Sequence, residues 1–232
     1  MTGMPAVAAA EERAGSSVDL VYRSLRRQIM DNSLPPNTQL LEQALVASFG
    51  VSRTPVREAL VRLEGEGLLQ IIPRHGARIL PLSLADMREI YEILASLEPT
   101  AAEIVTRRGL TAEELSAFDA ACDRMQAALD RDDLAGWAAA DDDYHHHLLD
   151  ICGNRRLRDF VRICFDQSRR AKFLTMRLRD TKPYRSVEEH RQVVAAMREG
   201  NAELAHAIYR RHRERARDEQ LGLLNRFGIT QA

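Results

Sequence analysis

Apolar residues recur at helical spacing through most of this chain, and turn-forming residues separate the segments. Between residues 16 and 32 they fall at positions 18, 21, 22, 25 and 29, which predicts one amphipathic helix. Beyond this region the same spacing predicts a run of helices at 84–108, 111–130, 132–152, 155–180, 184–199 and 201–226. The short polar connections between these helices are typical of an antiparallel bundle.

A different pattern occupies the stretch between the first helix and the bundle. Apolar residues at positions 41, 44, 45 and 49 predict a short helix, and Gly50 permits a sharp turn directly after it. We expect a second helix to begin with Thr54 as its N-cap and Pro55 in its first helical position. Two short helices joined by a tight glycine-containing turn form a helix-turn-helix.

Two β-leaning runs follow, at residues 68–72 and 77–80, and the polar tip Pro-Arg-His-Gly lies between them. This arrangement predicts a β-hairpin wing. Within the tip, Gly76 would let the backbone approach a ligand closely, and Arg74 and His75 are placed to enter a minor groove. The predicted fold class is therefore mainly α, with an N-terminal winged helix-turn-helix followed by an all-α antiparallel six-helix bundle.

Length and chain punctuation predict two domains with a tail at each end. A chain of 232 residues suits two modest domains, and Pro-Leu-Ser at 81–83 breaks the pattern between them as a linker. The domains are then 16–80 for the winged unit and 84–226 for the bundle. Residues 1–15 lack the basic leader of a signal peptide and are expected to be a disordered tail, and 227–232 form a C-terminal tail.

Charge and cysteine content narrow the class of protein. The net charge is −1, but the region 111–150 holds eleven acidic residues against two arginines, so we expect it to stay away from DNA. Three cysteines without paired spacing are typical of reduced thiols in a cytoplasmic protein. No stretch approaches the roughly 18 apolar residues of a membrane helix, so a membrane partner is not expected.

The start of the second short helix carries the residues best suited to bind a nucleic acid. Arg53 stands just before the expected cap and Arg57 lies one turn inside, where backbone N–H groups are unpaired and the helix dipole is positive. An arginine fork there can reach phosphates or guanine edges, and Ser52 and Thr54 add hydroxyl donors. The alternative is that both arginines are ordinary solvated charges.

The residues SRTPVREALVRLEGEGLL, followed by PRHG, closely resemble the winged helix-turn-helix of the GntR superfamily of bacterial transcription regulators. The resemblance covers roughly residues 21 to 80. It implies a DNA-contacting surface made by Ser52, Arg53, Thr54, Pro55, Arg57, Arg74, His75 and Gly76. The chain departs from the family at Asn32 and Asn37, where glycines are usual, but asparagine tolerates the left-handed backbone conformation.

A second candidate site lies in the bundle, where the third helix contains Asp-Asp-Asp-Tyr-His-His-His. Helical spacing points Asp141 and His145 toward the interior, while His190 and His212 lie on the apolar stripes of two later helices. A metal ion or a cationic partner would offset the cost of burying a carboxylate. Three imidazoles and a carboxylate suit zinc first, with nickel or manganese as alternatives, although core histidines or a surface cluster would give the same pattern.

The helical region also resembles a known domain. Its motifs are D-x-x-Y-H before L-x-x-x-x-G-N-x-x-L, then S-x-x-E-H and a late histidine, as in the FCD ligand-binding domain of the FadR branch. This resemblance implies a divalent metal held by Asp141, His145, His190 and His212, with a small organic acid bound beside it. Six helices suit the VanR-like subgroup.

One position departs from the pattern of that domain. Leu94 stands where members often have an arginine that would clamp a carboxylate. Arg169, Arg170 and Asn154 are the candidate replacements, and of these Asn154 is assigned to effector binding.

These features together predict a metabolite-responsive transcription regulator, a repressor that binds a palindromic double-stranded operator as a homodimer. One alternative is a metal-dependent hydrolase or oxygenase of the bundle, which would need open metal positions and a nearby base. The sequence shows no nucleophile–base pair, phosphate-binding glycine loop or cofactor fingerprint in its support. The other alternative is a purely structural dimer module, which predicts neither a metal nor salt-sensitive DNA binding.

Overall fold

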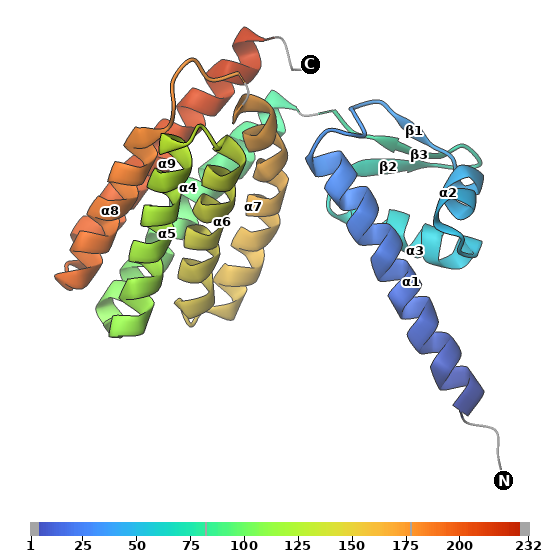
Figure 1. Cartoon of the computed structure of the whole chain (residues 1–232), viewed down its shortest axis with the longest axis horizontal. Helices are drawn as coiled ribbons and strands as arrows, with labels where there is room; N and C mark the ends of the chain where they lie inside the picture. Colours follow the sequence, from blue (N-terminus) through green and yellow to red (C-terminus); the bar gives the residue numbers. More distant parts are fainter. Residues whose placement is uncertain (1–4, 82, 177, 228–232) are drawn as a thin grey trace. The chain divides into compact units, whose positions relative to one another are not determined.

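The structure is a computed structural model that describes residues 5–81, 83–176 and 178–227, with the backbone alone at 5–16, 173 and 174 (Figure 1). The chain divides between residues 82 and 83 into two compact units, each described by itself below. The first combines three helices with a small sheet, and the second contains only helices among its described residues. The predicted class, mainly α with a winged helix-turn-helix before a helical domain, is confirmed.

The first unit is built from three helices and three short strands. In chain order they are α1 (Pro5–Met30), β1 (Gln39–Leu40), α2 (Glu42–Phe49), α3 (Arg53–Gly65), β2 (Leu69–Ile72) and β3 (Gly76–Ile79). The strands form an antiparallel sheet in the order β1-β3-β2, and the register pairs Ile72 with Gly76 across the wing. The apolar faces of these elements share one core, which includes Val21, Leu25, Ile29, Leu60, Leu63, Leu69 and Ile79.

Helix starts in this unit differ from the sequence prediction in two places. Helix α1 begins at Pro5, so residues 5–15 have a helical backbone instead of the expected disordered tail, because alanine and glutamate favour the helix strongly. Helix α3 begins at Arg53 with Ser52 at the N-cap, two residues earlier than predicted. Pro55 is still tolerated, because the first N–H groups of a helix have no intrahelical partner.

Left-handed residues close the turns of the first unit. Asn32 and Asn37 have φ of 61° and 66°, which confirms that asparagine can replace the glycines usual in the resembling family. Gly50 ends α2 with φ of 64°. Gly76 has φ of 81°, and a Cβ atom there would lie 2.1 Å from the backbone oxygen of Leu40. The wing therefore requires glycine at this position for both conformation and space.

The second unit contains six helices among its described residues. They are α4 (Leu84–Arg108), α5 (Ala112–Asp130), α6 (Leu134–Ile151), α7 (Arg155–Met176), α8 (Tyr184–Arg198) and α9 (Ala202–Arg226). Polar caps start several of them: Ser83 accepts the N–H of Asp86, and Thr111 forms a capping box with Glu114. Helix α7 ends at Met176, four residues before the predicted end. The expected C-terminal tail at 227–232 lies outside the described residues except for Phe227.

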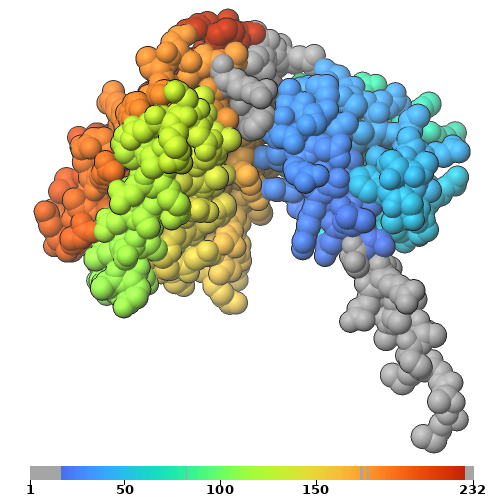
Figure 2. Space-filling model, in the orientation of Figure 1, coloured from blue at the N-terminus to red at the C-terminus, as the bar shows by residue number. Residues whose placement is uncertain are grey.

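The bundle interior is closed and mostly apolar. Helix α4 packs against α9 and α7, and α5 packs against α6. Large side chains such as Tyr144, Phe118, Leu94 and Met125 are fully buried. In Figure 2 side chains fill the spaces that Figure 1 leaves between these ribbons. None of the described helices has both the length and the apolar character needed to span a membrane.

Candidate functional site

The leading end of α3 is an exposed, basic surface of the first unit. Ser52, Arg53, Thr54 and Arg57 are all exposed, as a nucleic-acid contact requires. Pro55 is buried, so its expected place on the contact surface is wrong. Its side chain is buried while those of Arg53, Thr54 and Arg57 around it are exposed, so it does not add to the exposed surface.

A carboxylate on α2 holds the arginine that lies one turn inside α3. The Nε atom of Arg57 donates to both oxygens of Glu42, at 3.0 and 2.9 Å. The Arg57 side chain remains 64% exposed, whereas Glu42 is 27% exposed. Because Glu42 binds the Nε edge, the terminal amino groups of the guanidinium form the outer edge of the fork. The sequence analysis missed Glu42, and an acidic residue in the first turn of the preceding helix was its only signal.

The tip of the wing is polar and tied to the neighbouring strand. Arg74 and His75 are exposed, and Arg74 has φ of 66°. The N–H of His75 donates to the carbonyl of Ile72 at 2.9 Å, and Gln39 donates its side-chain amide to the His75 carbonyl at 3.0 Å. These bonds fix the tip relative to β1, so Arg74 and His75 project from a defined turn.

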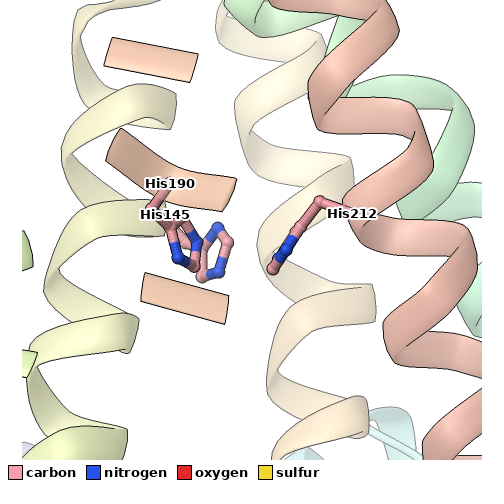
Figure 3. Close-up of side chains that lie close together, drawn as sticks. All are labelled: His145, His190 and His212. Atoms are coloured by element: carbon pink, nitrogen blue, oxygen red, sulfur yellow. The ribbon is translucent and has the colours of Figure 1, made fainter. Parts of the chain in front are cut away.

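Three histidines from three helices meet inside the bundle of the second unit. His145 on α6, His190 on α8 and His212 on α9 each offer one ring nitrogen, and these nitrogens lie within 4.8 Å of one another. Figure 3 shows His145 and His190 side by side, with His212 pointing toward them from the other side. All three rings are buried.

The predicted carboxylate lies at the edge of this histidine cluster. Asp141 Oδ2 is 3.5 Å from His145 Nε2, and Asp141 Oδ1 is 3.7 Å from His190 Nε2. Burial raises the pKa of Asp141, but the charge of Lys172 and then His145 outweigh it, and the pKa ends well below the usual value. The carboxylate is therefore ionised at neutral pH and available to a cation.

Glu189 on α8 orients His212. Its Oε2 atom accepts a hydrogen bond from His212 Nδ1 at 2.8 Å, and Arg215 donates to the same carboxylate at 2.7 Å. Burial raises the pKa of Glu189, but the hydrogen bonds from His212 and Arg215 reverse this, and the pKa lies well below its usual value. With Nδ1 protonated toward Glu189, His212 keeps the lone pair of Nε2 for the cluster.

His145 is contacted on its other nitrogen. Its Nδ1 atom lies 2.7 Å from the hydroxyl of Tyr209 and 3.0 Å from Nη2 of Arg213. A guanidinium can only donate, so Nδ1 accepts here, and the proton of the neutral ring is on Nε2, facing Asp141. Burial, followed by the nearby Arg213 charge, lowers the pKa of His145 well below its usual value.

Several buried nitrogens of the cluster have no hydrogen-bond partner within the described part of the chain. These are Nε2 of His145 and both ring nitrogens of His190. Burial and the neighbouring His212 lower the pKa of His190 to about 3, so its ring is neutral and offers a lone pair. Leaving such groups unsatisfied costs about 1–3 kcal/mol each, and a bound cation would remove that cost. The donor set, three imidazoles and a carboxylate, fits zinc and similar divalent ions.

Three charged residues at the site were missed by the sequence analysis. Lys172 on α7 donates to Asp141, and Arg213 on α9 forms a buried ion pair with Glu98 on α4. For Lys172 the sequence did hold a signal: its position continues the helical spacing of the buried residues Phe165 and Ser168. A charged residue on the buried face of a helix usually has a partner there. Arg213 directly follows His212, and nothing in the sequence pairs it with Glu98.

The cavity beside the histidines is small. Its volume is about 30 Å³, and its lining includes Trp137, Asp141, His145, Lys172, His212 and Arg213. That space holds roughly one water or one ion. Asn154, the predicted effector contact, is not part of the lining: it is exposed and accepts the Leu157 N–H at 3.1 Å, which caps α7. The structure gives Asn154 a capping role, as is usual for an asparagine before a helix, and its effector-binding assignment stays a prediction.

Two protein families match this chain. The FCD domain matches residues 89–215, and the bacterial regulatory proteins of the gntR family match residues 18–79. An uncharacterized HTH-type transcriptional regulator of Agrobacterium vitis, from the TAR-I ttuE-ttuC' intergenic region, is 40% identical over 146 residues, covering 60% of this chain and 85% of the relative. The HTH-type transcriptional repressor RspR of Escherichia coli K12 is 31% identical over 131 residues, covering 56% of this chain and 57% of RspR.

Solved structures share the fold. The chain is similar to E. coli McbR/YncC, with a TM-score of 0.75, 18% identity, and coverage of 91% of this chain and 98% of that one. A putative transcriptional regulator GntR from Rhodococcus sp. RHA1 gives a TM-score of 0.73, 23% identity, and coverage of 89% and 98%. The relatives and neighbours are transcriptional regulators, so the enzyme alternative is set aside.

Proposed function

We propose that this chain, which belongs to the gntR family of bacterial regulatory proteins and carries an FCD domain, is a metabolite-responsive repressor. It is a DNA-binding transcriptional regulator of that type, not an enzyme. In the proposal it acts in the cytoplasm as a homodimer on a palindromic operator, because a two-fold dimer presents two equal reading helices. Repression is supported by the name of its relative RspR.

The observation that carries the DNA-binding proposal is the pair of exposed arginines at the leading end of α3. Arg53 begins the helix and Arg57 lies one turn on, with its Nε edge held by Glu42. We assign base or phosphate contacts to both, supported by Ser52 and Thr54 beside them and by Arg74, His75 and the backbone of Gly76 at the wing. A held guanidinium loses less conformational entropy when it binds a guanine edge or a phosphate.

We assign the bundle cluster as a divalent metal site held by Asp141, His145, His190 and His212, with zinc first and nickel or manganese as alternatives. When bound, such an ion supplies a buried positive charge with open positions for a carboxylate ligand. To offer Nε2 to the ion, His145 would move its proton to Nδ1, where the Tyr209 hydroxyl at 2.7 Å could accept it. The Nη2 donor of Arg213, now 3.0 Å from Nδ1, would then have to turn away. The buried ring nitrogens of His145 and His190 that lack a hydrogen-bond partner among the described residues support this assignment.

The effector in this proposal is a small organic acid. Its pocket must open before it binds, since the cavity of about 30 Å³ is too small for several heavy atoms. Opening is thus the structural difference between the free and liganded states, and its coupling to DNA affinity is typically about 1–3 kcal/mol. The six helices of the described FCD unit support placement in the VanR-like subgroup.

The experiment that tests DNA binding selects operator fragments from a fragment library of the source genome and measures their affinity by gel shift. We expect Arg57→Ala to weaken binding to a selected fragment by about 1–3 kcal/mol, which is roughly five-fold to 150-fold. The matched control is Arg107→Ala, which removes an exposed, ion-paired arginine from the other unit. Equal affinities of the wild type and Arg57→Ala would refute the assigned reading helix.

A further inference from the structure

Lys172 is the cation nearest the proposed metal ligands, and its ammonium group is surrounded by oxygen atoms. Its Nζ atom lies 2.6 Å from Asp141 Oδ2, 2.8 Å from Asp142 Oδ1 and 3.4 Å from the carbonyl of Ala138. The Lys172 side chain is 14% exposed, and the indole ring of Trp137 lies 5.2 Å from the ammonium. The ammonium is thus coordinated by the protein much as a bound cation would be.

The oxygen that Lys172 binds is also the one that faces His145. Asp141 Oδ2 lies 3.5 Å from His145 Nε2, and the other carboxylate oxygen lies 3.7 Å from His190 Nε2. A divalent ion held by these nitrogens and by Asp141 would share the carboxylate with the ammonium. The two cations would then be separated by little more than one carboxylate group, and their mutual repulsion is weakly screened in a buried site.

We propose that Lys172 is a built-in cation that competes with the divalent metal for Asp141 and becomes the carboxylate anchor of the pocket once the metal is bound. The inference rests on the proposed metal site. Without metal, Lys172 is paired with both Asp141 and Asp142, and Arg169 pairs with Asp142 as well. With metal on Asp141, Lys172 retains Asp142 but loses half of its counter-charge.

When the metal takes Asp141 away from Lys172, the position of the ammonium determines which ligand it can attract. Lys172 and Arg213 both line the cavity next to the histidines, and Arg213 remains paired with Glu98. Arg179 and Arg215 also line the cavity, and they are paired with Glu219 and Glu189. The ammonium is therefore the lining cation that metal binding leaves short of a negative partner, and a carboxylate is the matching group. Lys172 would then take the place of the arginine that α4 lacks at Leu94, from a different helix.

This arrangement makes metal and anion binding cooperative. Metal binding removes a negative partner from Lys172, which increases the affinity of the cavity for an anion, and by linkage the anion increases the affinity for metal by the same factor. An effector of this kind would bind the metal-loaded protein more tightly than the metal-free protein. The lysine therefore couples the two ligands through the carboxylate of Asp141.

The first test measures Zn²⁺ affinity of the full chain by competition with a chromophoric chelator. We expect Lys172→Met, which keeps the apolar stem, to bind Zn²⁺ about ten-fold tighter or more, whereas Lys172→Arg, which keeps the charge, stays near wild type. Lys182→Met is the matched control, since Lys182 pairs with Asp132 at the surface. His145→Ala should lose Zn²⁺ binding, and circular dichroism checks that each variant is folded.

An equal or weaker Zn²⁺ affinity in Lys172→Met would overturn the competition and leave the metal site standing. If neither wild type nor Lys172→Met binds Zn²⁺, the metal site and this inference both fail, while an intact gel shift would still support the DNA-binding function. Binding by Lys172→Met alone would support the competition in its strongest form.

The second test uses succinate as the carboxylate probe and follows thermal unfolding with and without Zn²⁺. We expect succinate affinity to rise about five-fold or more on zinc loading of the wild type, and this gain to vanish in Lys172→Met but not in Lys182→Met. A succinate effect that is absent from the zinc-loaded wild type, or that is equal in Lys172→Met, would overturn the role of Lys172 as carboxylate anchor.

Discussion

Glu189 of α8 accepts a hydrogen bond from Nδ1 of His212 on α9, with 2.8 Å between the two atoms. Arg215 holds the same carboxylate from one turn further along α9. The carboxylate therefore sets the orientation and tautomer of the ring before any ligand arrives. His190, which directly follows Glu189 in the chain, is itself one of the three clustered histidines. Helix α8 therefore contributes one candidate ligand, His190, and the carboxylate that orients a second, His212.

Removing this carboxylate should weaken metal binding. We expect Glu189→Ala to lower Zn²⁺ affinity about 10–100-fold, because the ring of His212 loses its orienting partner. Glu189→Gln retains an acceptor oxygen and should lose less. The control is Glu188→Ala, at the adjacent exposed position, which should bind Zn²⁺ like the wild type. The chelator competition assay measures all four proteins, and an unchanged affinity in Glu189→Ala would contradict this orienting role.

The Glu42–Arg57 pair should contribute to operator specificity. Glu42→Ala removes the group that holds the Arg57 Nε edge, and it also removes a negative charge near the DNA surface. We expect the ratio of specific to non-specific DNA affinity to fall by roughly 1 kcal/mol, or about five-fold, with little loss of non-specific binding. Fluorescence anisotropy against selected and scrambled duplexes gives this ratio. Glu103→Ala, which breaks an exposed pair in α4, should leave it unchanged.

Stability of the metal-free protein should fall as the pH falls below about 6.5. Burial lowers the pKa of His145, His190 and His212, that of His190 to about 3. Below the unfolded pKa of about 6.5, a histidine is protonated in the unfolded chain but stays neutral in the folded protein. Each buried ring therefore lowers the free energy of unfolding by up to roughly 1.4 kcal/mol per pH unit. Asp141 has a lowered pKa, so its own contribution is lost only below about 3.8.

The measurement is thermal unfolding in chelator between pH 7.5 and 5. The melting temperature should decrease across this range, and His190→Gln should flatten the dependence because it removes one of the three groups. His75→Gln, at the exposed tip of the wing, serves as the control and should follow the wild type. A melting temperature that stays constant, or rises, on acidification would show that the histidines are not buried as neutral rings.

Gly76 should be intolerant of substitution. In Gly76→Ala the new methyl group would lie 2.1 Å from the Leu40 oxygen, at φ of 81°, so either β1 or the wing must move. We expect a loss of at least about 1–3 kcal/mol in the first unit, measured by hydrogen exchange of the β2 and β3 amides. Gly222→Ala, in α9, is the control with the opposite expected sign. A Cβ atom at this position meets no atom within 4 Å, so alanine should stabilise the helix by about 1 kcal/mol. Unchanged exchange in Gly76→Ala would contradict this close contact.

The sequence by itself determined the local structure. The period of apolar residues and the turn residues between them predicted the helix-turn-helix, the wing and the order of the six helices, because these signals act within a few residues of chain. The same period placed Asp141, His145, His190 and His212 on inward faces, where the structure brings them together. Asn32 and Asn37 took the left-handed conformations that their side chains permit.

Only the tertiary structure decided which side chains meet across helices. Lys172 on Asp141, Arg213 on Glu98 and Glu42 on Arg57 join residues far apart in the chain, and each contact depends on which faces of two helices pack together. The burial of Pro55 likewise depends on the surrounding domain, whereas the Asn154 cap is a local contact with Leu157 that the sequence analysis missed. Periodicity sets the direction of a side chain about its own helix axis, but its partner is set by the packing of the whole domain.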